Sequence, residues 1–130
     1  MALNYAARAR ALVGTRFRPQ GRSADGLDCV GLVLATFGLA TGTVRRNYSL
    51  KGNHEAEVRR GLAAHFREIG VRNLREGDVM LMNVAENQVH LAVRTATGFV
   101  HAHAGIGRVV ETPGLPDWPL LAVYRKRRSR

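Results

Sequence analysis

Cys29, the single cysteine of the chain, directly follows Asp28 and opens an apolar run. Apolar residues then recur at helical spacing until Gly38, namely Val30, Val33, Leu34 and Phe37. Because aspartate is a favourable N-cap, the pattern predicts a helix whose first turn holds the thiol. The N–H groups and the positive dipole end of a helix start stabilise a thiolate, and a nearby histidinium does so further. The position predicts a nucleophile; the alternative is a small buried hydrophobe.

Two β-type segments carry the histidines that could serve this thiol. A cysteine nucleophile needs a histidine to take and return a proton, and a third polar group to fix that ring. Strand alternation places His90 on one face of 88–94, and His101 and His103 on one face of 98–104. The connection 95–98 is short enough for a hairpin, which lets these faces coincide. Simple register sets His103 opposite His90 and His101 on the diagonal, but a bulge would change this, so the third residue stays open.

These side chains have two alternative roles. His90 could be a buried structural histidine with its hydrogen bonds satisfied, or Cys29 and the three histidines could form a zinc site. Histidines on one face of two adjacent strands favour catalysis over the first role. The cysteine is distant in sequence, and the chain has no Cys-x-x-Cys or His-x-x-x-His pair. We therefore expect neither a metal nor a cofactor.

The spacing of apolar residues is helical in the first half of the chain and alternates, as in strands, in the second half. Residues 3–13 predict an alanine-rich helix, 15–27 a loop around the entrance to the cysteine helix, and 55–69 a second amphipathic helix. Short β-type runs separated by turn residues follow at 78–83, 88–94, 98–104, 108–112 and 120–125. Helices followed by closely connected strands predict an α+β domain with its helices packed on one side of an antiparallel sheet.

The 130 residues, 45% of them hydrophobic, predict one domain over 1–124 followed by a basic tail at 125–130. Twenty lysines and arginines face ten acidic residues, for a formal charge of +10, so we expect an acidic partner. Nucleic acid, anionic lipid and cell-wall polymers all meet that condition. A single cysteine excludes an internal disulfide, and we see neither a secretion signal nor a run of about 18 apolar residues that would predict a membrane span.

Six segments carry a resemblance to a known family. They are Gly14-Thr15-Arg16-Phe17, Gly21-Arg22-Ser23, Gly26 to Val33, Leu74 to Val79, His90-Leu91-Ala92-Val93 and Gly98 to Ala102. Together, over about residues 6–104, they resemble the NlpC-type cell-wall cysteine peptidases. The resemblance implies a papain-like fold and a Cys-His-His triad that cleaves peptidoglycan stem peptides, often between D-glutamate and diaminopimelate. It implies Cys29 as nucleophile, His90 as general base and His101 as orienting residue, with His103 in reserve.

The sequence departs from the family at Phe17, where a tyrosine often stands whose hydroxyl contacts the oxyanion or substrate. We expect the backbone N–H of Cys29 to serve as oxyanion donor, joined by Gln20 or Ser23 from the preceding loop. Asp28 could hold a substrate amine, or it could only cap the helix.

The resemblance also implies a setting. Cellular members usually carry an export signal and wall-binding modules, and this sequence shows neither. The entrance segment 14–22 resembles versions found in the tails of bacteriophages and gene transfer agents. We expect a tail component, made in the cytoplasm, that acts at the bacterial cell wall, with peptidoglycan and neighbouring tail or baseplate proteins as partners. The rivals are a tail-hub protein that keeps the fold with little activity, which Phe17 favours, and a basic nucleic-acid-binding domain without a recognised reading motif.

Overall fold

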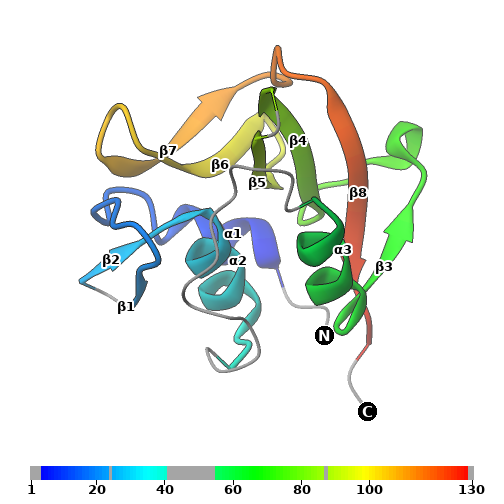
Figure 1. Cartoon of the computed structure of the whole chain (residues 1–130), viewed down its shortest axis with the longest axis horizontal. Helices are drawn as coiled ribbons and strands as arrows, with labels where there is room; N and C mark the ends of the chain where they lie inside the picture. Colours follow the sequence, from blue (N-terminus) through cyan, green and yellow to red (C-terminus); the bar gives the residue numbers. More distant parts are fainter. Residues whose placement is uncertain (1–3, 24, 41–54, 87, 129–130) are drawn as a thin grey trace.

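Three short α-helices and a six-stranded antiparallel sheet make up most of the part of the chain described by the computed structural model, residues 4–23, 25–40, 55–86 and 88–128 (Figure 1). The elements are α1 Tyr5–Arg10, β1 Arg22–Ser23, β2 Gly26–Leu27, α2 Cys29–Phe37, α3 Glu55–Ala63, β3 Phe66–Ile69, the 3₁₀ helix η2 Val71–Asn73, β4 Val79–Ala85, β5 Gln88–Arg94, β6 Gly98–His103, β7 Arg108–Pro113 and β8 Leu120–Lys126. Helices come first and long strands follow, which confirms the predicted α+β class. None of the described helices is both long and apolar enough to cross a bilayer.

The large sheet has the strand order β3-β8-β4-β5-β6-β7, and every neighbouring pair is antiparallel. The predicted strands at 78–83, 88–94, 98–104, 108–112 and 120–125 are all present, with ends shifted by at most two residues. The hairpin between β5 and β6 pairs Val93 with Val100 and Arg94 with Phe99. Strand alternation and turn chemistry are local signals, so these strands could be predicted from the sequence.

The segment 55–69 is not one helix, and that prediction is wrong. The helix α3 ends at Ala63, and Phe66–Ile69 forms the strand β3 at the edge of the sheet. Its register with β8 runs from Phe66 opposite Lys126 to Ile69 opposite Val123. The apolar spacing of this segment is typical of a helix. It carries no information on the pairing with β8, whose backbone groups need hydrogen-bond partners.

The other helix predictions fare differently. The cysteine helix is confirmed as α2, with Gly38 as its C-cap in the left-handed conformation at φ 66°. The N-terminal helix is shorter than 3–13 and runs only from Tyr5 to Arg10. The entrance segment 15–27 is mostly irregular, as predicted, but it contains the two-stranded sheet β1–β2.

The core lies between the helices and one face of the sheet (Figure 1). It takes Leu32, Val33 and Phe37 from α2, Val58 and Leu62 from α3, and Val79, Leu81, Leu91, Val93 and Val100 from the sheet. Side chains on alternate strand positions point to the opposite face, where Met80, Met82, Ala92 and Phe99 form a second cluster. Leu74, Trp118 and Leu120 pack against that cluster. Both faces of the sheet are therefore covered.

A buried ion pair joins the start of β4 to the end of β8. Asp78, 2% exposed, accepts hydrogen bonds of 2.8 Å from both Nε and a terminal nitrogen of Arg125, and a third from the backbone N–H of Arg75. Arg125 and Lys126 belong to β8, so the basic tail begins after residue 126 and not at 125. The pair fixes Arg125 because bidentate guanidinium–carboxylate contacts are strong and directional.

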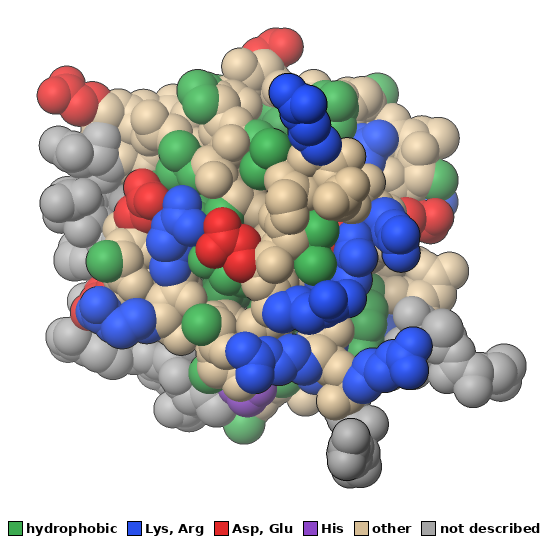
Figure 2. Space-filling model, turned by 90° about the vertical axis from the view of Figure 1, so that its right-hand side faces the viewer, with side chains coloured by type: hydrophobic (Ala, Val, Ile, Leu, Met, Phe, Trp, Pro, Cys, Tyr) green, Lys and Arg blue, Asp and Glu red, His purple; other side chains and the backbone are tan. Residues whose placement is uncertain are grey.

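Basic side chains gather on the face that carries α3, β3 and β8 (Figure 2). Exposed arginines of these elements and of the adjoining loops are Arg60, Arg67, Arg72, Arg75 and Arg127. Such an excess of one charge creates a field that attracts acidic partners.

Candidate active site

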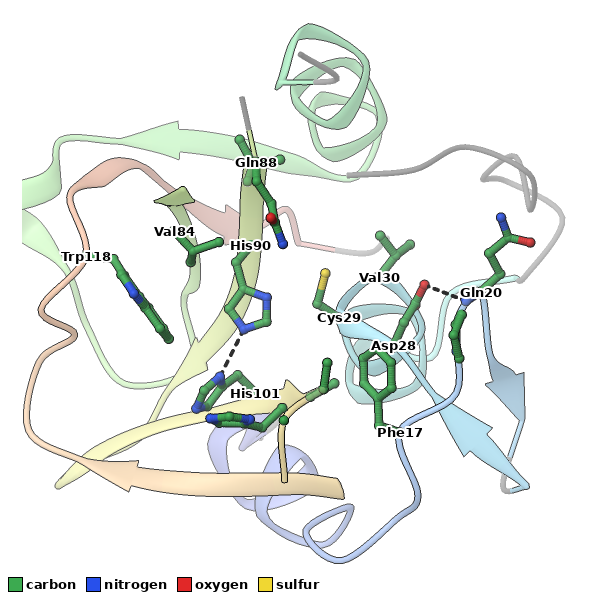
Figure 3. A pocket seen from close by; sticks show the side chains of 16 residues that line it. Phe17, Gln20, Asp28, Cys29, Val30, Val84, Gln88, His90, His101 and Trp118 are labelled. Carbon is green, nitrogen blue, oxygen red and sulfur yellow. Dashed lines mark hydrogen bonds between the residues drawn. The ribbon is translucent and has the colours of Figure 1, made fainter. Parts of the chain in front are cut away.

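A cavity of about 630 Å³ lies where the start of α2 meets β5 and β6 (Figure 3). It is lined by Phe17, Pro19, Gln20, Asp28, Cys29, Val30, Val84, Gln88, Val89, His90, His101, Ala102, His103, Ala104, Gly105 and Trp118. The entrance loop, the cysteine helix and the histidine hairpin, which are far apart in sequence, thus share one cavity.

The start of α2 is fixed by Asp28. Its Oδ1 accepts a hydrogen bond of 2.8 Å from the backbone N–H of Gly31, which confirms the predicted N-cap. Its Oδ2 accepts one of 3.1 Å from the backbone N–H of Gln20 in the entrance loop. Cys29 is the first residue of the helix and is 3% exposed, and its side chain lies beside the His90 ring (Figure 3). One carboxylate therefore caps the helix and holds the loop beside the thiol.

Two glycines let the entrance loop fold closely on itself and lie directly on the cysteine helix. A Cβ at Gly31 would overlap the carbonyl oxygen of Gly21, and a Cβ at Gly21 would overlap that of Gly26. Only glycine allows the backbones to approach this closely. The loop then continues to Phe17, whose backbone N–H donates to the carbonyl of Gly107 at 2.8 Å.

The histidines form a hydrogen-bonded pair. Nε2 of His90 lies 2.9 Å from Nδ1 of His101, and Nε2 of His101 lies 3.0 Å from the Oγ1 of Thr112 on β7. His103 also lines the cavity, with its ring centroid 5.5 Å from that of His101, but its Nδ1 accepts the backbone N–H of Ile106. Of the two alternatives that the sequence left open, the structure brings His101 into contact with His90.

These contacts set the tautomers that a proton acceptor at His90 requires. Nε2 of His90 is bound to His101, so Nδ1 is the nitrogen left to accept from Cys29, and it lies on that side of the ring (Figure 3). A neutral His90 that accepts at Nδ1 carries its proton on Nε2 and donates it to Nδ1 of His101. His101 in turn carries its proton on Nε2 and donates it to Thr112. The arrangement is a directed chain that ends at a hydroxyl.

Burial keeps the pair uncharged. Burial, as the largest cause, together with the nearby His101 and His103 lowers the pKa of His90 to about 3. Burial likewise lowers the pKa of His101 to about 4, with His103 as the second cause. Both rings are therefore neutral near pH 7, the state in which His90 can take a proton.

Three residues of the site were missed by sequence reasoning. Trp118, from the connection between β7 and β8, lies edge-on to both rings, with centroids 5.8 Å from His90 and 5.9 Å from His101. The Oγ1 of Thr112 is hydrogen-bonded to Nε2 of His101. Gln88 points into the cavity toward Cys29 and His90 (Figure 3). Alternation along β5 could have identified Gln88, which stands two positions before His90; no local signal marks the other two.

The remaining predicted site residues divide. Gln20 and Asp28 line the cavity, although the Gln20 side chain lies at the rim and points away from Cys29 (Figure 3). The structure does not bring Ser23 to the site: it is exposed, and its Oγ accepts the backbone N–H of Asp25 at 3.3 Å. Among the described residues, no group of three or more His, Cys, Asp or Glu is arranged to hold a metal ion.

The chain is similar to known proteins in sequence and in fold. Residues 14–115 match the sequence model of the NlpC/P60 family. The chain is 26% identical over 106 residues to the murein DD-endopeptidase MepS/murein LD-carboxypeptidase of Escherichia coli (strain K12), over 81% of this chain and 51% of the relative. The chain thus spans about half the length of the curated relatives it matches.

Solved structures share the fold at low identity. The NlpC/p60 domain of peptidoglycan hydrolase SagA superposes with a TM-score of 0.60 at 19% identity, covering 85% of this chain and 86% of that one. NlpC2 from Trichomonas vaginalis gives 0.69 at 16% identity, over 94% and 45%. RipD from Mycobacterium tuberculosis, described as a non-catalytic NlpC/p60 domain protein adapted to peptidoglycan binding, gives 0.57 at 15% identity, over 95% and 94%.

Proposed function

Because the chain belongs to the NlpC/P60 family, we propose that it is a cysteine endopeptidase that hydrolyses the peptide stems of peptidoglycan. One observation carries the proposal: the thiol at the start of α2 lies beside a histidine that is hydrogen-bonded to a second histidine, inside one cavity. The related murein endopeptidases and the named peptidoglycan hydrolase domain support the choice of substrate.

In the first step the Cys29 sulfur attacks the carbonyl carbon of a stem amide, and the thiol proton moves to Nδ1 of His90. The imidazolium is stabilised through its Nε2–H bond to His101, whose own N–H donates to Thr112. The carbonyl oxygen gains negative charge and faces the start of α2. The positive end of the helix dipole favours that charge, and the backbone N–H of Cys29 remains our candidate oxyanion donor.

The tetrahedral intermediate then collapses. The C–N bond breaks, the leaving amine takes the proton from His90, and a thioester to Cys29 remains. His90 next removes a proton from a water molecule, which attacks the thioester carbon. The C–S bond breaks, the proton returns to the thiol, and the carboxylic acid product leaves.

We propose that the scissile bond joins D-glutamate to diaminopimelate. Among the described residues that line the cavity there is neither Lys nor Arg, and Asp28 is the one carboxylate. A carboxylate has about four lone-pair sites, so Asp28 can hold a substrate amine while it accepts the two backbone N–H groups. The name of the Escherichia coli relative supplies the alternatives, a DD-endopeptidase or an LD-carboxypeptidase cleavage.

We further propose that the protein reaches the wall as a component of a phage-like tail. The resemblance of the entrance segment to tail peptidases and the basic face around β3 and β8, which suits acidic neighbours, support this setting (Figure 2). Mass spectrometry of purified particles tests it directly: the protein should copurify with tail components after nuclease and high-salt washes. Its absence from every particle fraction would overturn the placement.

A second candidate function is peptidoglycan binding without cleavage. Phe17 favours it, because this residue lines the cavity without the hydroxyl that a tyrosine would supply. The precedent in this fold is RipD, which is described as non-catalytic.

Digestion of purified peptidoglycan by the wild-type chain and by Cys29→Ala separates these functions. Mass spectrometry of the released muropeptides should show new termini from the wild type alone, and their masses identify the bond. If neither protein releases products while both cosediment with the polymer, the binding function is correct and the peptidase is not.

A further inference from the structure

Trp118 is the one aromatic residue, among the ring contacts within the described residues, that lies against both histidines of the pair. Its ring plane makes angles of 82° with His90 and 73° with His101, so it meets both rings edge to face. It also lines the cavity and is partly buried. Figure 3 shows it on the side of His90 that lies away from Cys29.

The indole also packs against residues of the sheet. Trp118 packs against the second hydrophobic cluster, formed by Met80, Met82, Ala92 and Phe99 on the face of the sheet away from the helices. Prolines at 116 and 119 flank it in the connection between β7 and β8 and restrict the backbone there. The ring thus contacts both this small core and the histidine pair.

We propose that Trp118 is a positioning residue that holds His90 and His101 in their hydrogen-bonded geometry and excludes water from that bond. The contact itself is independent of any reaction, whereas its catalytic consequence rests on the peptidase function proposed above. The role differs from that of His101, because Trp118 acts on both rings through packing and not through a hydrogen bond.

Water competes for imidazole nitrogens wherever it can reach them. In the 2.9 Å contact, His101 is 2% exposed and His90 is partly buried, and Trp118 covers one side of both rings. Removing the indole would admit water, free the His90 ring to rotate away from Cys29, and favour the protonated form of both rings. A protonated His90 cannot accept the thiol proton, so attack would begin to slow at a higher pH than in the wild type.

Other titratable groups near the pair stay unchanged in a Trp118 variant. Cys29 and Asp28 face it from α2 and His103 from β6. On β7, Glu111 is bound to Arg10 and Thr95, and Asp117 is an exposed neighbour of Trp118. If the histidine pKa values change with the size of the side chain at position 118, the cause is therefore the loss of the indole and not these charged groups.

The test is an NMR titration of the histidine ring protons in the full chain, for the wild type, Trp118→Phe and Trp118→Ala. The matched control is Leu120→Ala, which removes a residue from the same cluster that does not line the cavity. We expect the pKa of His90 and of His101 to rise by about one unit or more in Trp118→Ala, by less in Trp118→Phe, and to stay at wild-type values in the control. Unchanged values in a folded Trp118→Ala would overturn the proposal.

Two further readouts keep the outcomes distinct. Near-ultraviolet and far-ultraviolet circular dichroism establishes that each variant is folded; if Trp118→Ala is not, Trp118→Phe must still show the smaller shift, or the proposal fails. On peptidoglycan, the acidic limb of the pH–rate profile should move to higher pH in the order wild type, Phe, Ala. If the wild type cleaves nothing but the histidine values shift as expected, the positioning role stands and the proposed peptidase function falls.

Discussion

Nε2 of His90 lies 2.9 Å from Nδ1 of His101, a diagonal contact across the β5–β6 hairpin. The residue that simple register sets opposite His90 is His103, which instead accepts the backbone N–H of Ile106. The diagonal contact leaves Nδ1 of His90 for the thiol of Cys29. The two histidines of β6 therefore have different expected effects on activity.

Replacing His101 with alanine should slow peptidoglycan cleavage by about 100-fold or more, because His90 loses the group that fixes its tautomer. The matched variant His103→Ala should retain activity within a few-fold, since His103 makes no hydrogen bond to the pair. Initial rates of muropeptide release measure both. A larger loss in His103→Ala than in His101→Ala would reverse the assignment.

Thr112 should contribute through the last hydrogen bond of the chain. Thr112→Val removes the acceptor of the His101 N–H while keeping the side-chain shape, and it should lower the cleavage rate by roughly 2- to 10-fold, the equivalent of one neutral hydrogen bond. Thr112→Ser keeps the hydroxyl and should stay close to the wild type. Equal rates for Val and Ser would show that the hydroxyl does not act on His101.

The depressed pKa values of His90 and His101 also make folding depend on pH. Between the ordinary pKa of 6.5 and the native values of about 3 and 4, the unfolded chain binds more protons than the folded one. Stability contributed by these groups is therefore complete above pH 6.5 and declines as the pH falls through that window. Urea unfolding at several pH values should show the decline, and His90→Gln should flatten it; an identical slope in the variant would contradict this origin.

The Asp78–Arg125 pair should dominate the electrostatic contribution to stability. Asp78→Asn removes the carboxylate that binds Arg125 at a position only 2% exposed, and it should cost about 3 kcal/mol in the free energy of unfolding. A matched surface change, Glu55→Gln, breaks the exposed contact with Arg59 in α3 and should cost only about 0.5 kcal/mol. Similar costs for the two variants, measured by denaturant unfolding, would refute a special role for Asp78.

The sequence predicted the parts of this site that depend on local signals. Asp28 and Gly38 are caps that bound α2 directly, so the placement of Cys29 in the first turn followed from neighbouring residues. Strand alternation likewise put His90 on one face of its strand, and His101 together with His103 on one face of the next. The family resemblance then selected His101 over His103, a choice that spacing alone left open.

What the sequence did not predict depends on distant partners. Phe66 continues a helical spacing, and only its pairing with β8 makes it a strand residue. Thr112 contacts His101 because β7 is the neighbour of β6 in the sheet, and Trp118 contacts the histidines because of the path of the connection between β7 and β8. Neither feature can be predicted from the adjacent residues in the sequence. Ser23 was expected to join the oxyanion donors from the loop before α2, but it lies in β1, is exposed, and accepts the backbone N–H of Asp25.

The central claim is that the Cys29 sulfur forms a covalent bond to the substrate. Rapid-quench intact mass spectrometry with a synthetic stem peptide tests it, followed by peptide mapping of the adduct. We predict a transient mass increase equal to the acyl group of the N-terminal fragment, that is, the carboxylic acid product less one water, located on Cys29 and absent from Cys29→Ala. Cleavage that continues in Cys29→Ala, or product release by the wild type through an adduct on another residue, would contradict the account.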